Sequence, residues 1–80
     1  MTVIRTSPEQ QRALKLLASS GHAVNEDLLI RSYGFSRGVL ASLVRRRLAA
    51  RESEVMEASG KTIEVVRLRI TAAGRKAIEG

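Results

Sequence analysis

The sequence has 80 residues and carries 14 Lys and Arg against 8 Asp and Glu, a formal net charge of +6. A chain of this length forms one domain, residues 1–80, whose core is too small for a deep substrate pocket, and the absence of cysteine excludes disulfides and thiolate metal sites. Because no apolar run approaches about 18 residues and residues 1–5 do not resemble a leader, we expect a cytoplasmic protein without a membrane span.

The first predicted helix covers residues 8–20. Ser7 suits the N-cap, Pro8 the first helical position, and Gln10 the third position of a capping box. Apolar side chains recur on one side of this segment at the helical period. Gly21 is the expected end, because glycine accepts the left-handed conformation that terminates many helices.

Two further helices are predicted, with a break of only two residues between them. The second covers residues 26–33 after an Asn25 cap and is expected to turn Leu28, Leu29 and Tyr33 inward. Gly34 and Phe35 form the break, which requires a sharp corner between two packed helices. The third helix is capped by Ser36 and ends near residue 46 or 47. Residues 26–48 therefore match a helix-turn-helix pattern.

After the third helix the sequence period changes to that of strands. Residues 50–56 and 62–71 are the predicted strands, with a hairpin loop at residues 58–61 and a bulge where Val65 and Val66 interrupt the alternation. An isolated hairpin is marginal in water, so we expect Val66, Leu68 and Ile70 to pack against the first and third helices. Thr71 caps a short last helix over residues 72–79. The predicted class is α+β.

Three stretches of the chain resemble the DNA-binding core of winged helix-turn-helix regulators, above all the MarR-like group. They are the turn Tyr33-Gly34-Phe35-Ser36 with the apolar residues after it, Leu48 at the end of the third helix, and residues 68–75, which resemble the segment L-x-I-T-x-x-G-R. The resemblance implies three helices, a β-hairpin wing at about residues 50–70, a short C-terminal helix and a DNA-binding role. Two departures stand out: the chain has no room for the long dimerisation helices of that group, and Arg47 stands where many members have glycine.

The third helix carries the candidate binding residues. Between residues 36 and 51 there are five Arg and no acidic residue, and small side chains share the outward side of the helix with these cations. Such a surface fits the major groove of DNA. We expect Ser42, Arg45 and Arg46 to read bases, Gly38 to allow close approach, and phosphates to be held by Ser36, Arg37, Arg51 and Lys61. No motif for catalysis, a cofactor or a metal ion is found.

Two features keep other functions open. Residues 52–66 hold four Glu against one Lys, so the wing repels DNA except at its tip, and a winged-helix protein-interaction module is the alternative to a transcription regulator or accessory factor. RNA binding is a weaker alternative because aromatic residues are scarce. A single module makes few DNA contacts, so we expect a homodimer or a protein partner, with the first or the last helix as the interface.

Overall fold

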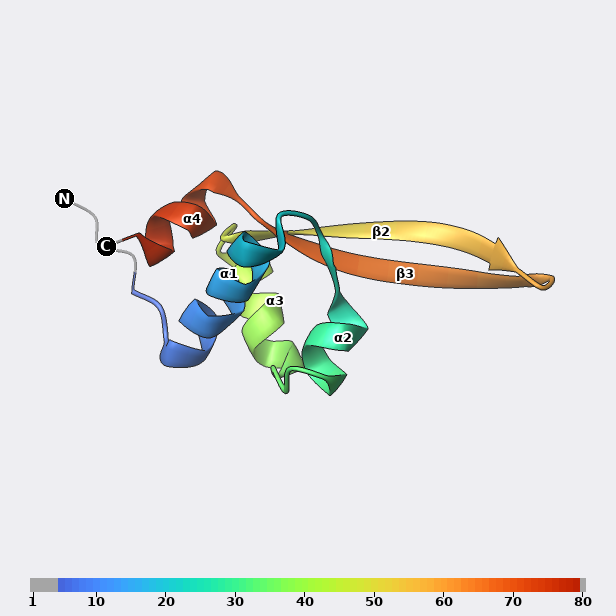
Figure 1. The fold of residues 1–80 in the computed structure, drawn as a ribbon, viewed down its shortest axis with the longest axis horizontal. Coiled ribbons are helices and arrows are strands. Elements are labelled where there is room, and N and C mark those ends of the chain that lie inside the picture. Colours follow the sequence, from blue (N-terminus) through green and yellow to red (C-terminus); the bar gives the residue numbers. More distant parts are fainter. Residues whose placement is uncertain (1–4, 80) are drawn as a thin grey trace.

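Four helices and a three-stranded antiparallel sheet make up residues 5–79, the part of the chain that the structure describes. In this computed structural model the elements are α1 (Pro8–Ser20), β1 (Val24–Asn25), α2 (Glu26–Arg31), α3 (Arg37–Arg45), β2 (Ala49–Ala58), β3 (Lys61–Ile70) and α4 (Ala72–Ile78) (Figure 1). The strand order is β1-β3-β2, and the α+β class is confirmed. Residues 1–4, which include most of the segment inspected for a leader, and Gly80 lie outside the described residues.

Each of these helices begins at a side chain that accepts hydrogen bonds from the free N–H groups of the first turn. In α1, Ser7 Oγ accepts from the Gln10 N–H (3.1 Å) and Gln10 Oε1 accepts from the Ser7 N–H (2.9 Å), which is the expected capping box. Gly21 ends this helix at φ +70°. The predicted caps at Asn25, Ser36 and Thr71 are also present. Local sequence therefore determines where these helices start.

The second helix is shorter than predicted, because α2 ends at Arg31 and not at residue 33. The N–H groups of Ser32 and Tyr33 both donate to the carbonyl of Leu28, at 2.9 and 3.3 Å, and the chain leaves the helix there. The expected inward orientation of Leu28 and Tyr33 is wrong, since they are 45% and 52% exposed. Leu29 is the one buried residue of this helix.

The corner between α2 and α3 is built as the sequence predicts. Gly34 has φ +77°, a conformation that costs glycine little. Phe35 follows it with its side chain buried and its N–H donating to Leu29 O at 3.1 Å. Tyr33 stacks on the Phe35 ring at 6.5 Å between centroids, on the solvent side. The short break thus holds α2 and α3 in a fixed relative position.

Strands β2 and β3 pair in one continuous antiparallel register from Ala49↔Ile70 to Ala58↔Lys61. The predicted bulge at Val65 and Val66 is therefore absent from this ladder. Much of the hairpin lies beyond the core, and there the side chains on both faces are exposed to solvent. Val65 and Val66 can therefore occupy opposite faces without a bulge, because neither face has to be buried. Ser59 and Gly60 close the hairpin with φ +53° and +75°, the left-handed pair that suits a two-residue turn.

The short strand β1 was not predicted. It has only two residues, which pair with β3 as Val24↔Leu68 and Asn25↔Arg67. Two residues are too few to show a strand period. Its place is set by tertiary packing, because Val24 is buried in the same core as Leu68.

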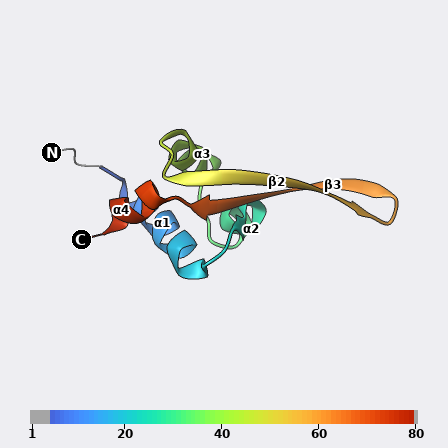
Figure 2. The same ribbon diagram turned by 90° about the horizontal axis from the view of Figure 1, so that it is seen from above.

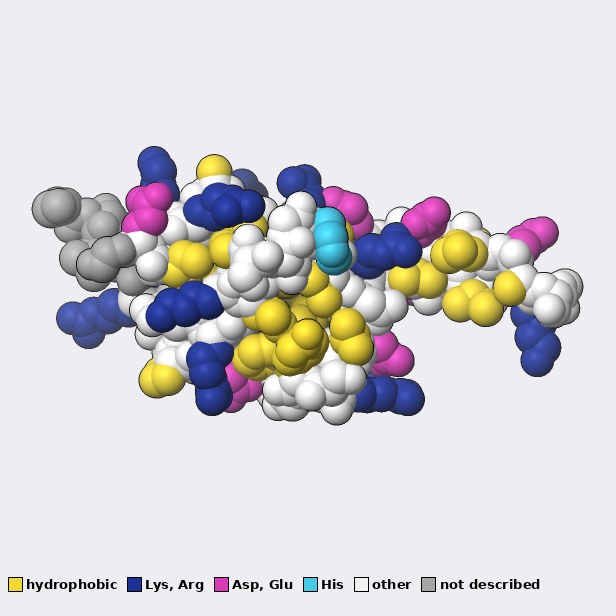
Figure 3. All heavy atoms as spheres, viewed as in Figure 1, with side chains coloured by type: hydrophobic (Ala, Val, Ile, Leu, Met, Phe, Trp, Pro, Cys, Tyr) yellow, Lys and Arg dark blue, Asp and Glu magenta, His cyan; other side chains and the backbone are white. Residues whose placement is uncertain are grey.

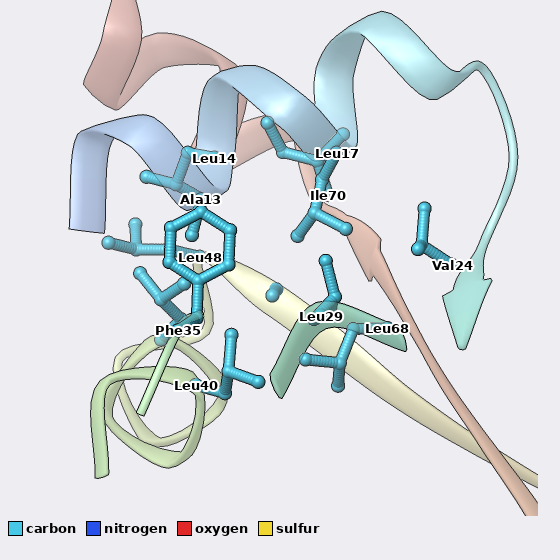
Figure 4. Packing of buried hydrophobic residues seen from close by; sticks show 12 residues of the cluster. Ala13, Leu14, Leu17, Val24, Leu29, Phe35, Leu40, Leu48, Leu68 and Ile70 are labelled. Atoms are coloured by element: carbon cyan, nitrogen blue, oxygen red, sulfur yellow. The ribbon is translucent and has the colours of Figure 1, made fainter. Parts of the chain in front are cut away.

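The buried core lies where the helices meet the base of the hairpin (Figure 4). It is almost entirely aliphatic, with Phe35 as its one ring. Leu68 and Ile70 are buried as expected, whereas Val66 is only half-buried because it lies further out along the strand. The molecule measures 52 × 22 × 21 Å, and the long dimension comes from the hairpin, which projects away from the helices (Figures 1 and 2).

The end of α3 has a left-handed residue that is not glycine. Arg47 has φ +62°, its N–H donates to Val44 O at 3.0 Å, and the Leu48 N–H donates to Leu43 O at 2.9 Å. These two hydrogen bonds form a Schellman motif, in which the left-handed position favours glycine. The helix therefore ends in a conformation that favours glycine, with an arginine at the left-handed position.

We expect Arg47→Gly to stabilise the fold by about 1 kcal/mol, because it removes the contact between Cβ and the carbonyl oxygen that makes this conformation costly. For a domain of this size the melting temperature should rise by roughly 4–8 °C. Arg46→Gly is the matched control, since Arg46 has φ −82° and should lose stability on becoming glycine. A lower melting temperature for Arg47→Gly would contradict this account of the helix end.

Candidate nucleic-acid interface

One side of α3 is buried and the other is open to solvent. Leu40 and Leu43 pack into the core, while Gly38, Ala41 and Arg45 are exposed. At 100° per residue the three exposed residues fall within a narrow sector of the helix. Because two of them are small, the surface of α3 is open to close approach beside the Arg45 side chain. No atom lies within 4 Å of the position that a Cβ on Gly38 would take.

A hollow of about 360 Å³, which we call the arginine hollow, lies beside this open side. It is lined by side chains of α3, the first residue of α2 and the base of β2: Glu26, Arg37, Leu40, Ala41, Val44, Arg45 and Arg51. Three cations thus surround a largely aliphatic floor. An anionic group of a ligand can approach the three arginines while the apolar part of the same ligand packs on the aliphatic floor. This arrangement suits a ligand with a row of phosphates.

One carboxylate partly neutralises the arginine hollow. Glu26 and Arg51 form an ion pair at 3.1 Å, with the Glu26 side chain 17% exposed and that of Arg51 55% exposed. Glu26 also occupies the first turn of α2, where the helix dipole favours a negative charge. Arg37 and Arg45 form no ion pair within residues 5–79. The hollow therefore keeps an excess of positive charge.

Ser42 and Arg46 lie on the other flank of α3, against α1. Ser42 Oγ donates to Val39 O (2.6 Å) and accepts from Gln10 Nε2 (2.8 Å), and Arg46 Nη1 donates to Gln10 Oε1 (3.3 Å). Ser42 is half-buried in this contact, whereas Arg46 is exposed. These two predicted residues therefore help to join α1 to α3 and do not line the arginine hollow with Arg45.

The N-terminus of α3 already has an acidic neighbour. Ser36 Oγ accepts from the Val39 N–H (3.1 Å), which is the predicted cap, and the Ser36 N–H donates to Glu9 Oε2 of α1 (3.2 Å). The carboxylate of Glu9 thus lies where a phosphate was expected to dock. Arg37, in the first turn, is exposed and belongs to the arginine hollow.

Lys61 lies far from the other predicted residues. It pairs with Ala58 next to the hairpin turn, and nine residue steps of β2 separate Ala58 from Ala49 at the base, about 30 Å of strand. Arg67 pairs with Glu54 at 2.7 Å and Arg69 with Glu52, so two ion pairs cross the hairpin. Within the described chain the other two glutamates of the hairpin, residues 57 and 64, form no ion pair.

Neither a cluster of metal-ligating side chains nor a membrane-spanning helix is found in the described chain. Residues 5–79 contain no group of three or more His, Cys, Asp and Glu side chains placed to hold a metal ion. His22 is exposed, and its Nδ1 lies 2.9 Å from the neighbouring Ala23 carbonyl. None of the helices within residues 5–79 is long and apolar enough to cross a membrane.

Comparison with known proteins adds no relative: no family model matches the chain, and neither a curated protein nor a solved structure matches it. Three residues around the candidate interface were missed from sequence, namely Glu9, Gln10 and Glu26. Gln10 was interpreted only as a helix cap, and that role leaves its amide nitrogen free to reach α3. No local pattern indicates such a contact between distant segments.

Proposed function

We propose that this chain is a single winged helix-turn-helix domain that binds double-stranded DNA, as a cytoplasmic transcription regulator or accessory factor without catalytic activity. The observation that supports this most directly is the arginine hollow beside the open side of α3. Three cations there surround an aliphatic floor with one carboxylate among them. In this proposal β2 and β3 form the wing, and the resemblance of residues 68–75 to the MarR-like segment is in keeping with it.

The geometry favours different DNA contacts for different residues of α3 and its neighbours. Gly38 and Ala41 allow the helix to lie close to base edges in the major groove, and Arg45 is the exposed residue beside them that can donate two hydrogen bonds to guanine. Arg37 and Arg51 lie around the hollow and contact phosphates. Ser42 and Arg46 are assigned to the α1 flank, where Arg46 can still reach a phosphate from its exposed position.

The wing makes a smaller contribution in this proposal. Arg67 and Arg69 neutralise two of its four glutamates, and the remaining two lie near Lys61, so its strands offer no excess of positive charge to the phosphate backbone. Lys61 and the turn can touch DNA only if the tip alone approaches it. Specific binding therefore depends on α3 and on Arg51 at the base of β2, and mutations of the wing beyond Arg51 should alter affinity much less than mutations of the arginine hollow.

Fluorescence anisotropy with labelled duplex DNA, single-stranded DNA and RNA tests the proposal. We expect duplex to bind most tightly, with log K falling against log salt at a slope of about −3, roughly one unit for each of the phosphate contacts made by Arg37, Arg46 and Arg51. Equal affinity for the three nucleic acids would show that binding is only non-specific charge attraction, which contradicts the proposal. No duplex binding at low salt would exclude the proposal.

Glu26→Gln should strengthen duplex binding about three- to tenfold, since it removes the carboxylate of the arginine hollow and frees Arg51 for a phosphate. The salt slope should become steeper by about one unit. Asp27→Asn is the matched control: Asp27 is the next residue of α2, pairs with Arg31 at 3.6 Å and does not line the hollow. Equal gains for both variants would show that only net charge matters.

A protein-interaction module remains the second candidate, because residues 52–66 of the projecting hairpin hold four Glu against one Lys and include exposed apolar side chains. In that case the arginine hollow would meet an acidic protein surface. A pull-down that recovers a protein after nuclease treatment, combined with no duplex binding at low salt, would select this function.

A further inference from the structure

The part of the hairpin beyond the core has two faces of different character. Side chains alternate between faces along each strand, and directly paired residues share a face. One face continues the core side of Leu68 and Ile70. The opposite face, which we call the outer face, consists of Ala50, Glu52, Glu54, Met56, Ala58, Lys61, Ile63, Val65, Arg67 and Arg69.

The outer face combines exposed apolar side chains with neutralised charges. Met56 and Ile63 form a directly opposed pair and are each 47% exposed, and Val65 lies beside them. Toward the base of the hairpin, ion pairs join Arg67 to Glu54 and Arg69 to Glu52. The unpaired glutamates at 57 and 64 point to the core side instead. The outer face therefore has an apolar centre and little net charge, which favours contact with protein over contact with nucleic acid.

We infer that this outer face is the contact surface for a second copy of the chain. Two hairpins packed face to face about a twofold axis through the Met56–Ile63 pair would place these four apolar side chains together. Same-face positions along a strand are about 7 Å apart. From the Met56–Ile63 pair, Lys61 lies one same-face position toward the turn on β3, and Glu54 lies one same-face position toward the base on β2. Antiparallel stacking therefore brings Lys61 of each copy opposite Val65 of the other, one strand spacing from Glu54 and within reach of a long lysine side chain.

This charge complementarity favours a second copy over an unrelated partner. The same face supplies the apolar centre, Lys61 of β3 on one side of it and Glu54 of β2 on the other, and the Glu54 side chain, 59% exposed, can contact a second cation besides Arg67. A twofold axis matches such a surface to itself without further residues. The inference is independent of the proposed DNA binding, because the arginine hollow contains no residue of the outer face.

The size of the face predicts a weak dimer. Four same-face positions on two strands cover a surface of about 20 Å by 10 Å, or about 200 Å². This area is well below the roughly 800 Å² that each partner buries in a standard interface. We therefore expect association at high protein concentration, strengthened when both copies occupy one duplex.

Cross-linking tests the geometry directly. The chain has no cysteine, so Met56→Cys introduces a single thiol at the centre of the proposed interface. A short bismaleimide should convert this variant to dimer at least tenfold faster than Val55→Cys. Val55 is the adjacent residue on the core-side face and is more accessible, at 65% exposed. Equal rates, or a faster Val55→Cys, would overturn the inference.

Analytical ultracentrifugation without DNA supplies the second measurement. Ile63→Lys should shift dimerisation to at least tenfold higher concentration, and Val55→Lys should leave it unchanged. Another hydrophobic patch lies over α1 and α2 below His22 (Figure 3), and Leu28 is an exposed apolar side chain of α2. A dimer that is lost in Leu28→Lys but kept in Ile63→Lys would overturn the inference and assign the interface to that patch. A chain that stays monomeric at every concentration would overturn it as well.

Discussion

Reversing the charges of Arg37 and Arg45 together should lower the affinity for duplex DNA by at least about 100-fold at 0.1 M salt. Both side chains line the arginine hollow and are exposed, so the double variant Arg37→Glu/Arg45→Glu removes two contacts and places two repelling carboxylates beside Glu26. A base contact by arginine contributes about 1–3 kcal/mol, and each lost phosphate contact also lessens the salt dependence. Anisotropy titrations at several salt concentrations measure both effects.

The fold should tolerate this change. Neither arginine forms an ion pair within the described chain, and a glutamate at residue 37 would lie in the first turn of α3, where negative charge is favourable. Arg12→Glu/Lys15→Glu changes net charge by the same amount on exposed positions of α1. We expect this control to lose less than tenfold in affinity. An equal loss in the two double variants would remove α3 from the proposed mechanism.

Gly74→Ala should strongly destabilise the fold. Gly74 is buried in α4, and a Cβ added there would lie 2.1 Å from the carbonyl oxygen of Leu48 and 2.8 Å from Ile70 Cγ1. The Leu48 carbonyl cannot move freely, because it accepts a hydrogen bond from the Thr71 N–H at 3.1 Å. The backbone of α4 must therefore shift away from the end of α3.

We expect this substitution to cost about 3 kcal/mol or more, as in other overpacked sites, and to lower the melting temperature by at least roughly 12 °C. Gly38→Ala is the matched control: Gly38 is also helical, but its Cβ position is empty within 4 Å. There the alanine should add about 0.5–1 kcal/mol of stability. Thermal and urea unfolding of the two variants compare the predictions, and similar stability for both would contradict the role given to Gly74.

Local chemistry accounts for what could be predicted from this sequence. Capping side chains and glycines act within a few residues of their own position, so the starts of the helices and the corner at Gly34 and Phe35 are correct. The turn at Ser59 and Gly60 lies within the predicted loop. The candidate site is predicted in outline for the same reason, because the helical period alone places Arg45 on the open side of α3.

What the sequence by itself determined is therefore the type and order of the main helices and strands, and the cationic character of α3. Tertiary structure decided which cations act together: Arg51 of β2 joins Arg37 and Arg45 around one hollow, while Ser42 turns to Gln10 of α1. It also decided that β1 exists, because β1 forms only by pairing with β3. Each of these outcomes depends on contacts between segments far apart in the chain, whose free energies exceed local preferences and leave no local pattern.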